Sequence, residues 1–251
     1  MKTIVICDDG DLGAGVAAAR RLGVGLEVQQ FYDPVVAVDT SAVRGTHQAV
    51  AGLSPLGIHG PFGDLCPGSF DAMIRDATRH RFELGWSVAH ELNASHLILH
   101  HGYVPGTTPP PNWIIRCSAF WKEYLANKPT AVQFHMENML EHGPELLRDV
   151  LDAVGARNLT ACLDIGHAHC HSRTTVMRWV EVLGSRIGYV HIHNNHGESD
   201  EHLEPYEGTL DVAEVLLAIH HHSPGAIWAL EAPLDTVDRS MEWLADVAES
   251  V

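Results

Sequence analysis

The chain has 251 residues, of which 45% are hydrophobic and 19% charged, a composition typical of a folded globular protein and a length typical of one (β/α)₈ barrel. Its 32 acidic residues outnumber its 16 basic residues, so nucleic acid is a disfavoured partner for want of a basic patch. Five cysteines without CxxC spacing argue against a disulfide framework and favour a cytoplasmic location, and no apolar run suits a signal peptide or a membrane span.

Short, nearly continuous apolar segments alternate along the chain with segments of helical periodicity. The apolar segments predict strands that are buried on both faces. The predicted strands cover residues 3–7, 25–31, 56–60, 95–101, 130–137, 159–164, 186–193 and 226–231. The predicted helices cover residues 12–23, 69–93, 144–155, 209–222 and 235–251. The pattern of residues 33–55 is weak, and residues 104–113 are expected to form a proline-rich loop.

Eight strands that alternate with helices predict an α/β fold, a single (β/α)₈ TIM barrel whose one domain covers residues 1–251. A doubly wound open sheet is the alternative, and it requires a glycine-rich phosphate loop after the first strand. The segment that follows this strand, DDGDLGAG, contains acidic residues that would repel a pyrophosphate. The closed barrel is therefore the preferred prediction.

Potential metal ligands or acid–base groups end six consecutive predicted strands. In a barrel, the carboxyl ends of the strands converge on one site. A single histidine or glutamate at a strand end is more often structural, but six in register predict a shared polar site, because burying such groups is costly unless they are paired or metal-bound. The residues are His59, His100, His101, Glu137, Asp164, His167, His191, His193 and Glu231.

The seventh predicted strand offers two histidines, His191 and His193. Side chains alternate along a strand, so both point to the same side, opposite to Val190 and Ile192. His193 is nearer the carboxyl end, which favours it over His191 as the ligand.

Several segments in residues 57–232 resemble the xylose isomerase-like barrel superfamily, which includes sugar epimerases and endonuclease IV. They are GIHGPFGDLCPGS, LILHHGY, HMENMLE, CLDIGHAH, YVHIHNNHGESDEHLEPYEGTLD and WALEA. In the isomerase and epimerase members, two glutamates, an aspartate and a histidine hold one metal ion, and the glutamates also exchange the proton. The resemblance assigns these roles to Glu137, Asp164, His193 and Glu231, with Glu137 and Glu231 as the catalytic pair.

Endonuclease IV has a larger, trinuclear zinc site, and this chain has a suitable residue at every corresponding position. By resemblance, the first ion would contact His59, His100 and Glu137, the second ion the quartet, and the third ion His167, Asp200 and His202. Asp200 and His202 also fit an ordinary solvated loop. Among other histidines, His135 and His196 stay undecided, and His169, His171 and residues 220–222 are expected at the surface or at helix ends. Phe62, Trp113 and Trp228 could stack on a sugar or pack in the core.

Three functions follow from this set of residues. The preferred one is a sugar or sugar-phosphate isomerase or epimerase that uses Mn²⁺, Mg²⁺, Co²⁺ or Zn²⁺ and transfers a proton through an enediolate, with His167 and His100 binding the substrate. The alternative is a zinc-dependent phosphoesterase of endonuclease IV type, in which an activated hydroxide attacks a phosphodiester. A non-catalytic metal-binding module is the third. The expected partner is a small sugar; the oligomeric state stays open, although relatives are often dimers or tetramers.

Overall fold

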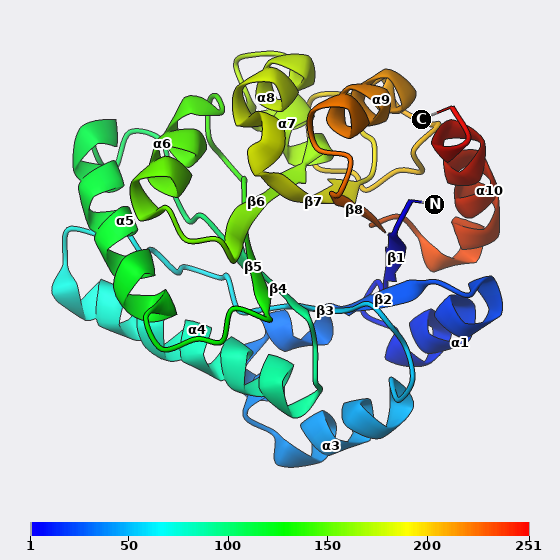
Figure 1. The fold of residues 1–251 in the computed structure, drawn as a ribbon, viewed down its shortest axis with the longest axis horizontal. Coiled ribbons are helices and arrows are strands. Elements are labelled where there is room, and N and C mark those ends of the chain that lie inside the picture. Colours follow the sequence, from blue (N-terminus) through cyan, green and yellow to red (C-terminus); the bar gives the residue numbers. More distant parts are fainter. Residues whose placement is uncertain (1, 251) are drawn as a thin grey trace.

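The computed structural model describes residues 2–250, and in it eight parallel strands form a closed barrel. Each strand pairs with the next along the chain, and β1 pairs with β8 to close the circle (Figure 1). The predicted fold class is therefore confirmed, and the open sheet is excluded. The strands are β1 Ile4–Cys7, β2 Gly25–Val28, β3 Leu56–His59, β4 His96–His100, β5 Gln133–Glu137, β6 Leu159–Asp164, β7 Ile187–Ile192 and β8 Ile227–Leu230.

The helices surround the barrel and cover the outer faces of its strands (Figure 1). They are α1 Leu12–Leu22, α2 Pro34–Ala37, α3 Thr40–Ala49, α4 Ala72–Glu91, α5 Pro110–Leu125, α6 Glu145–Val154, α7 Ile165–His171, α8 Val176–Leu183, α9 Val212–His222 and α10 Val237–Ala248. Short 3-10 turns cover Gln30–Tyr32, Gly184–Arg186 and Leu234–Thr236.

Alternate residues of each strand point into the barrel, and the others pack against the helices. One apolar cluster, which includes Val5, Ile98 and Tyr189, fills the barrel interior, and a larger one lies between strands and helices. On β2, Leu26 and Val28 belong to the outer cluster, so Glu27 between them faces inward. The interior is therefore mixed, with carboxylate and imidazole groups next to apolar side chains.

The structure corrects the sequence-based prediction of helices in three segments. Residues 33–55 contain α2 and α3, and α7 and α8 lie between the sixth and seventh strands, where no helix was expected. The proline-rich segment is a loop only as far as Pro109, because Pro110 begins α5. Proline suits the first turn of a helix, where its missing N–H is not needed. The run of prolines thus signals the start of α5 as well as a loop.

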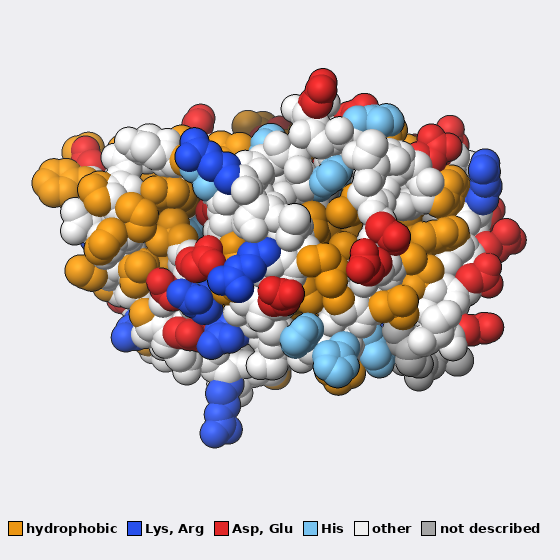
Figure 2. Space-filling model, turned by 90° about the horizontal axis from the view of Figure 1, so that it is seen from above, with side chains coloured by type: hydrophobic (Ala, Val, Ile, Leu, Met, Phe, Trp, Pro, Cys, Tyr) orange, Lys and Arg blue, Asp and Glu red, His pale blue; other side chains and the backbone are white. Residues whose placement is uncertain are grey.

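The surface of the barrel is mixed in character. On the face shown in Figure 2, lysine and arginine side chains lie among acidic ones, beside areas of apolar side chains. Among the described residues, no helix combines the length and the apolar character that crossing a membrane requires.

Candidate metal centre

The predicted polar site forms at the carboxyl ends of β3 to β8. His59, His100, Glu137 and Asp164 are the last residues of β3, β4, β5 and β6, and Glu231 directly follows β8. The strand register places His100 beside Glu137 and Asp164 beside His191. The barrel thus brings together groups from distant parts of the chain.

The first set of possible ligand atoms comes from His59, His100 and Glu137. Nε2 of His59 lies 3.2 Å from Glu137 Oε2, and Nε2 of His100 lies 3.3 Å from the same oxygen. The two imidazole nitrogens are 3.3 Å apart. His59 donates its Nδ1–H to the carbonyl oxygen of Gly60, which leaves Nε2 without a proton in the neutral ring and free to accept a cation.

The second set surrounds Nδ1 of His191. This nitrogen lies 3.3 Å from Glu137 Oε1, 3.3 Å from Glu231 Oε2 and 3.7 Å from Asp164 Oδ2. It is buried and has no hydrogen-bond partner. Glu137 therefore faces the first set with one oxygen and the second set with the other.

The third set consists of His167, Asp200 and His202, at the edge of the site. Asp164 caps the amino end of α7 by accepting a hydrogen bond from the backbone N–H of His167 at 2.6 Å. His167 donates its Nδ1–H to the carbonyl oxygen of Asn138, and its Nε2 lies 3.2 Å from Asp200 Oδ2. Nε2 of His202 lies 3.1 Å from the same oxygen, so the loop residues do meet the barrel.

His193, which the sequence favoured over His191, occupies a different position. Strand β7 ends at Ile192, so His193 lies beyond it, between the second and third sets. Its Nε2 lies 3.1 Å from both carboxylate oxygens of Asp164, and its ring stacks on His202 with centroids 4.1 Å apart. Gly166 makes room for this ring, because a Cβ there would lie 2.0 Å from His193 Cε1.

The separations between these atoms match those of a metal coordination shell. A tetrahedral ion with bonds of about 2.0 Å separates its ligand atoms by about 3.3 Å. The three edges of the first set, two contacts of the second set and both contacts of the third set lie between 3.1 and 3.3 Å. The donor atoms, imidazole nitrogen and carboxylate oxygen, are those that Zn²⁺, Mn²⁺ and Co²⁺ accept. The residues therefore fit divalent metal.

Opposite charges compensate for the burial of these groups. Burial raises the pKa of Glu137, but His100 and His191 beside it lower the pKa well below its usual value. Burial alone would lower the pKa of His167, but Asp164 and Asp200 raise it well above its usual value. Positive charge is thus favoured between the carboxylates, whether protons or a metal ion supply it.

Several residues that support the site escaped the sequence reasoning. Gln29 donates a side-chain hydrogen bond to Glu231 Oε1, and Asn138 exchanges two hydrogen bonds of 2.9 Å with the backbone of Asp164. Glu27 accepts a hydrogen bond from His191 inside the barrel. An acidic residue in the predicted strand 25–31 was the available signal for Glu27, whereas Gln29 in the same strand and Asn138 beside Glu137 are amides with no feature that marks them as supporting residues.

A pocket of about 430 Å³ opens at the mouth of the barrel, and Gln29, His202 and Glu231 line it. A larger pocket, of about 710 Å³, lies at the amino-terminal end around Lys2 and Leu22. We assign the chemistry to the smaller pocket, because active sites of such barrels lie at the carboxyl ends of the strands.

Of the three aromatic residues considered for sugar stacking, two lie in the core and one lies beside the site. Trp113 and Trp228 are fully buried. Phe62 stacks on His100 with ring centroids 4.2 Å apart, and it stacks on Tyr32 at 5.5 Å. The two tryptophans therefore offer no free face to a sugar, whereas the partly exposed Phe62 lies beside His100 of the first set.

Comparison with known proteins identifies the family and the fold. Residues 17–247 match the model of the family described as xylose isomerase-like TIM barrel. The structure superposes on the TTHB071 protein of Thermus thermophilus, from a ZnCl₂ soak (TM-score 0.81, 24% identity, 100% of this chain and 98% of that chain). It also superposes on a D-tagatose 3-epimerase-like protein (TM-score 0.80, 22% identity, 100% and 98% of the chains). These two similarities concern the fold.

A curated relative, the uncharacterized protein MJ1311 of Methanocaldococcus jannaschii, is 29% identical over 178 residues. The match covers 63% of this chain and spans 58% of the length of that relative.

Proposed function

Since the chain belongs to the xylose isomerase-like TIM barrel family, we propose that it is a divalent-metal-dependent sugar isomerase or epimerase that moves a proton through an enediolate. The observation that carries the proposal is the set around His191, in which Glu137, Asp164 and Glu231 direct carboxylate oxygens toward one imidazole nitrogen. The similarity to a D-tagatose 3-epimerase-like protein supports the sugar as the substrate class.

The proposed ligands of the central ion are Glu137, Asp164, Glu231 and a histidine of the seventh strand. The geometry favours His191 for this last role, and His193 contacts Asp164 from beyond the strand. A divalent ion held there would polarise the carbonyl group of a sugar and bind its adjacent hydroxyl group. The first and third sets offer places for further ions or, through His100 and His167, for substrate oxygens.

Glu137 and Glu231 are the proposed proton carriers. They approach Nδ1 of His191 from β5 and from the end of β8, two separated sides of the barrel. One carboxylate would remove the proton next to the carbonyl group, and the other would return a proton to the enediolate. Gln29 holds Glu231 in place, and the pocket beside Glu231 has room for a monosaccharide.

Solvent proton exchange tests this reaction directly. The protein would be stripped with a chelator, reloaded with Mn²⁺, Mg²⁺, Co²⁺ or Zn²⁺, and incubated in D₂O with a panel of ketoses and aldoses. We expect deuterium next to the carbonyl carbon of at least one sugar by NMR. Glu137→Gln and Glu231→Gln should each lower the exchange rate by at least 100-fold, because each removes a proton carrier.

The exposed Glu242→Gln on α10 is the matched control for these substitutions and should exchange at the wild-type rate. If no sugar acquires deuterium with any ion, or if the glutamine variants retain full exchange, the proposal is wrong.

A zinc-dependent phosphoesterase is the second candidate, favoured by the three adjoining sets of ligand atoms. The charge of −16 disfavours a large polyanionic substrate, so a small phosphodiester is the relevant probe. Three zinc ions per chain by elemental analysis, with turnover of bis(p-nitrophenyl) phosphate that His59→Ala abolishes, would establish this alternative. One ion per chain and no phosphodiester turnover would exclude it.

A further inference from the structure

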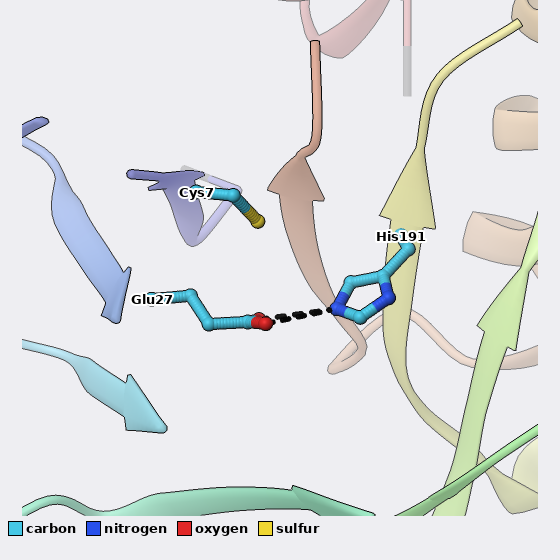
Figure 3. A group of neighbouring side chains, drawn as sticks. All are labelled: Cys7, Glu27 and His191. Atoms are coloured by element: carbon cyan, nitrogen blue, oxygen red, sulfur yellow. Dashed lines mark hydrogen bonds and ion pairs between the residues drawn. The ribbon is translucent and has the colours of Figure 1, made fainter. Parts of the chain in front are cut away.

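Glu27 lies inside the barrel, beneath the candidate metal centre. It is neither a proposed metal ligand nor a proposed proton carrier. It is fully buried, and both of its carboxylate oxygens contact Nε2 of His191, at 3.2 and 3.1 Å. Figure 3 shows the Glu27 and His191 side chains pointing toward one another across the barrel, with Cys7 beside them. Burying a carboxylate among apolar side chains costs folding free energy unless the carboxylate is paired. The contact with His191 supplies this pairing.

The contact decides which nitrogen of His191 carries a proton. An ionised carboxylate only accepts hydrogen bonds, so Nε2 must carry the proton that points at Glu27. The other nitrogen, Nδ1, is then the one that can release its proton and present a lone pair. It is also the nitrogen that is buried without a hydrogen-bond partner and that faces Glu137 and Glu231.

A bare lone pair that faces carboxylates would be repelled by them, so a positive charge belongs between these groups, either a proton on Nδ1 or a metal ion that replaces it. In metal enzymes, an imidazole ligand commonly donates its second N–H to a carboxylate, which fixes the ring and makes the ligand nitrogen more basic. Glu27 stands in this relation to His191, and it comes from β2, which contributes no ligand of its own to the three sets.

We propose that Glu27 is a positioning residue for the metal centre: its carboxylate fixes the tautomer and orientation of His191, so that Nδ1 serves as the ligand of the central ion. The proposal rests on the metal site of the proposed function, though not on its sugar chemistry. Glu27 would not touch the ion itself. It would act on the ion only through the imidazole ring of His191, which separates the two.

Cys7 allows a competing arrangement and also supplies the control. With Glu27 and His191 it forms a buried group whose ligand atoms all lie within 4.8 Å of one another. An ion bound inside this group would need a lone pair on Nε2 of His191. In the tautomer described above, Nε2 carries a proton and has no free lone pair. Burial raises the pKa of the Cys7 thiol well above its usual value, so Cys7 is a neutral neighbour of the pair.

The test is a titration of metal-free protein with Co²⁺. Isothermal calorimetry measures the affinity, and the visible absorption of the bound ion reports its coordination. Glu27→Gln should weaken the affinity for one ion by 10- to 100-fold and change its absorption bands, because the amide lacks the charge that makes Nδ1 basic. Glu27→Ala should weaken it further. Cys7→Ala, which alters the same buried group, should bind like the wild type.

Equal affinity and equal spectra in wild type and Glu27→Gln would overturn the proposal. Loss of one ion in Cys7→Ala would also overturn it, because the ion would then lie beneath the site. Should Glu27→Ala fail to fold, ¹⁵N NMR of imidazole nitrogens in the zinc-loaded wild type still decides: we expect a proton on Nε2 of His191, and a proton on Nδ1 contradicts the proposal. Wild-type protein that binds the ion but exchanges no sugar proton refutes only the proposed reaction.

Discussion

At the residue scale, the length of strand β7 separates the positions of His191 and His193. Alternation correctly places His191 and His193 on the same side, but β7 ends at Ile192. His191 is therefore the last inward-facing residue of the strand and lies level with Asp164, whereas His193 lies farther out, near His202. His193, which the sequence favours as the ligand, lies beyond the end of the strand and faces Asp164 and Asp200.

Substitution of His191 and of His193 should have unequal effects on metal binding. His191→Gln keeps an N–H near the position of Nε2, and so keeps a donor for Glu27, but it lacks Nδ1. We expect this variant to lose at least 100-fold in affinity for the central ion, by competition with a chromophoric chelator. His193→Gln should lose less than 10-fold, and the opposite order would return the ligand role to His193.

Two other buried histidines, His96 and His135, should make the protein sensitive to acid. Nδ1 of His96 lies 2.9 Å from Nε2 of His135, which contacts Thr160 through its own Nδ1. Burial lowers the pKa of His96 to about 4 and that of His135 well below its usual value. The neutral forms are therefore favoured by folding, and this contribution to stability is complete above pH 6.5.

As the pH falls from 6.5 toward 4, the unfolded chain gains protons at these histidines that the folded chain does not. Between pH 7.5 and pH 5 the contribution of His96 to stability should fall by about 2 kcal/mol, whereas histidines with a raised pKa, such as His167, change stability in the opposite direction. Urea unfolding of wild type and His96→Gln in chelator at both pH values isolates the contribution of His96, because stability should change less favourably in the wild type by this amount. An identical loss in wild type and His96→Gln would show that His96 does not titrate in this way.

At the element scale, the loop between β7 and α9 owes its shape to Asn194. This buried side chain donates to the carbonyl oxygens of Pro205 and Leu210 and accepts from two backbone N–H groups. Its backbone also pairs with Leu203. Asp200 and His202 lie within the loop, so their approach to His167 depends on these hydrogen bonds.

Asn194→Ala should release the loop, because the carbonyl groups it leaves unpaired cost about 2 kcal/mol in total. We expect faster hydrogen exchange over residues 197–209, measured by mass spectrometry, and weaker binding at the third set. The exposed Asn112→Ala on α5 is the control and should leave exchange in the loop unchanged. Wild-type protection in Asn194→Ala would mean that the loop is held by other contacts.

The elements also differ in how well the sequence predicts them. The strands were found because residues buried on both faces give short, continuous apolar runs. Helix α7 was not predicted because it is a short run of seven residues, rich in histidine, that follows Asp164 without a turn. Asp164 is both the N-cap of α7 and a candidate metal ligand. An aspartate at this position therefore indicates the start of a helix as well as a possible ligand.

At the scale of the whole molecule, the candidate centre gathers charge from β3 around to β8. Without a cation, the carboxylates of Glu137, Asp164 and Glu231 repel one another and depend on protonated histidines. An ion that binds only the folded protein adds stability by mass action, about 2.7 kcal/mol per ion at a concentration 100 times its Kd.

Removal of metal should therefore lower the melting temperature. For one ion in 100-fold excess over its Kd, we expect the loaded protein to melt about 5–10 °C above the chelated protein in a calorimetric scan. The scan should be repeated with Mg²⁺, Mn²⁺, Co²⁺ and Zn²⁺ to find the preferred ion. An unchanged melting temperature with all four would argue against any tight metal site.

The sequence by itself determined the barrel, its strands and the polar residues that end them, because these depend on local periodicity and on the rule that parallel strands share one functional end. Only the tertiary structure decided how those residues divide into sets, that Nδ1 of His191 faces Glu137, Asp164 and Glu231, and that Glu27 meets His191 from 164 positions away. Such pairs are set by strand register and by side-chain direction across a closed barrel, and no local pattern in a single chain encodes them.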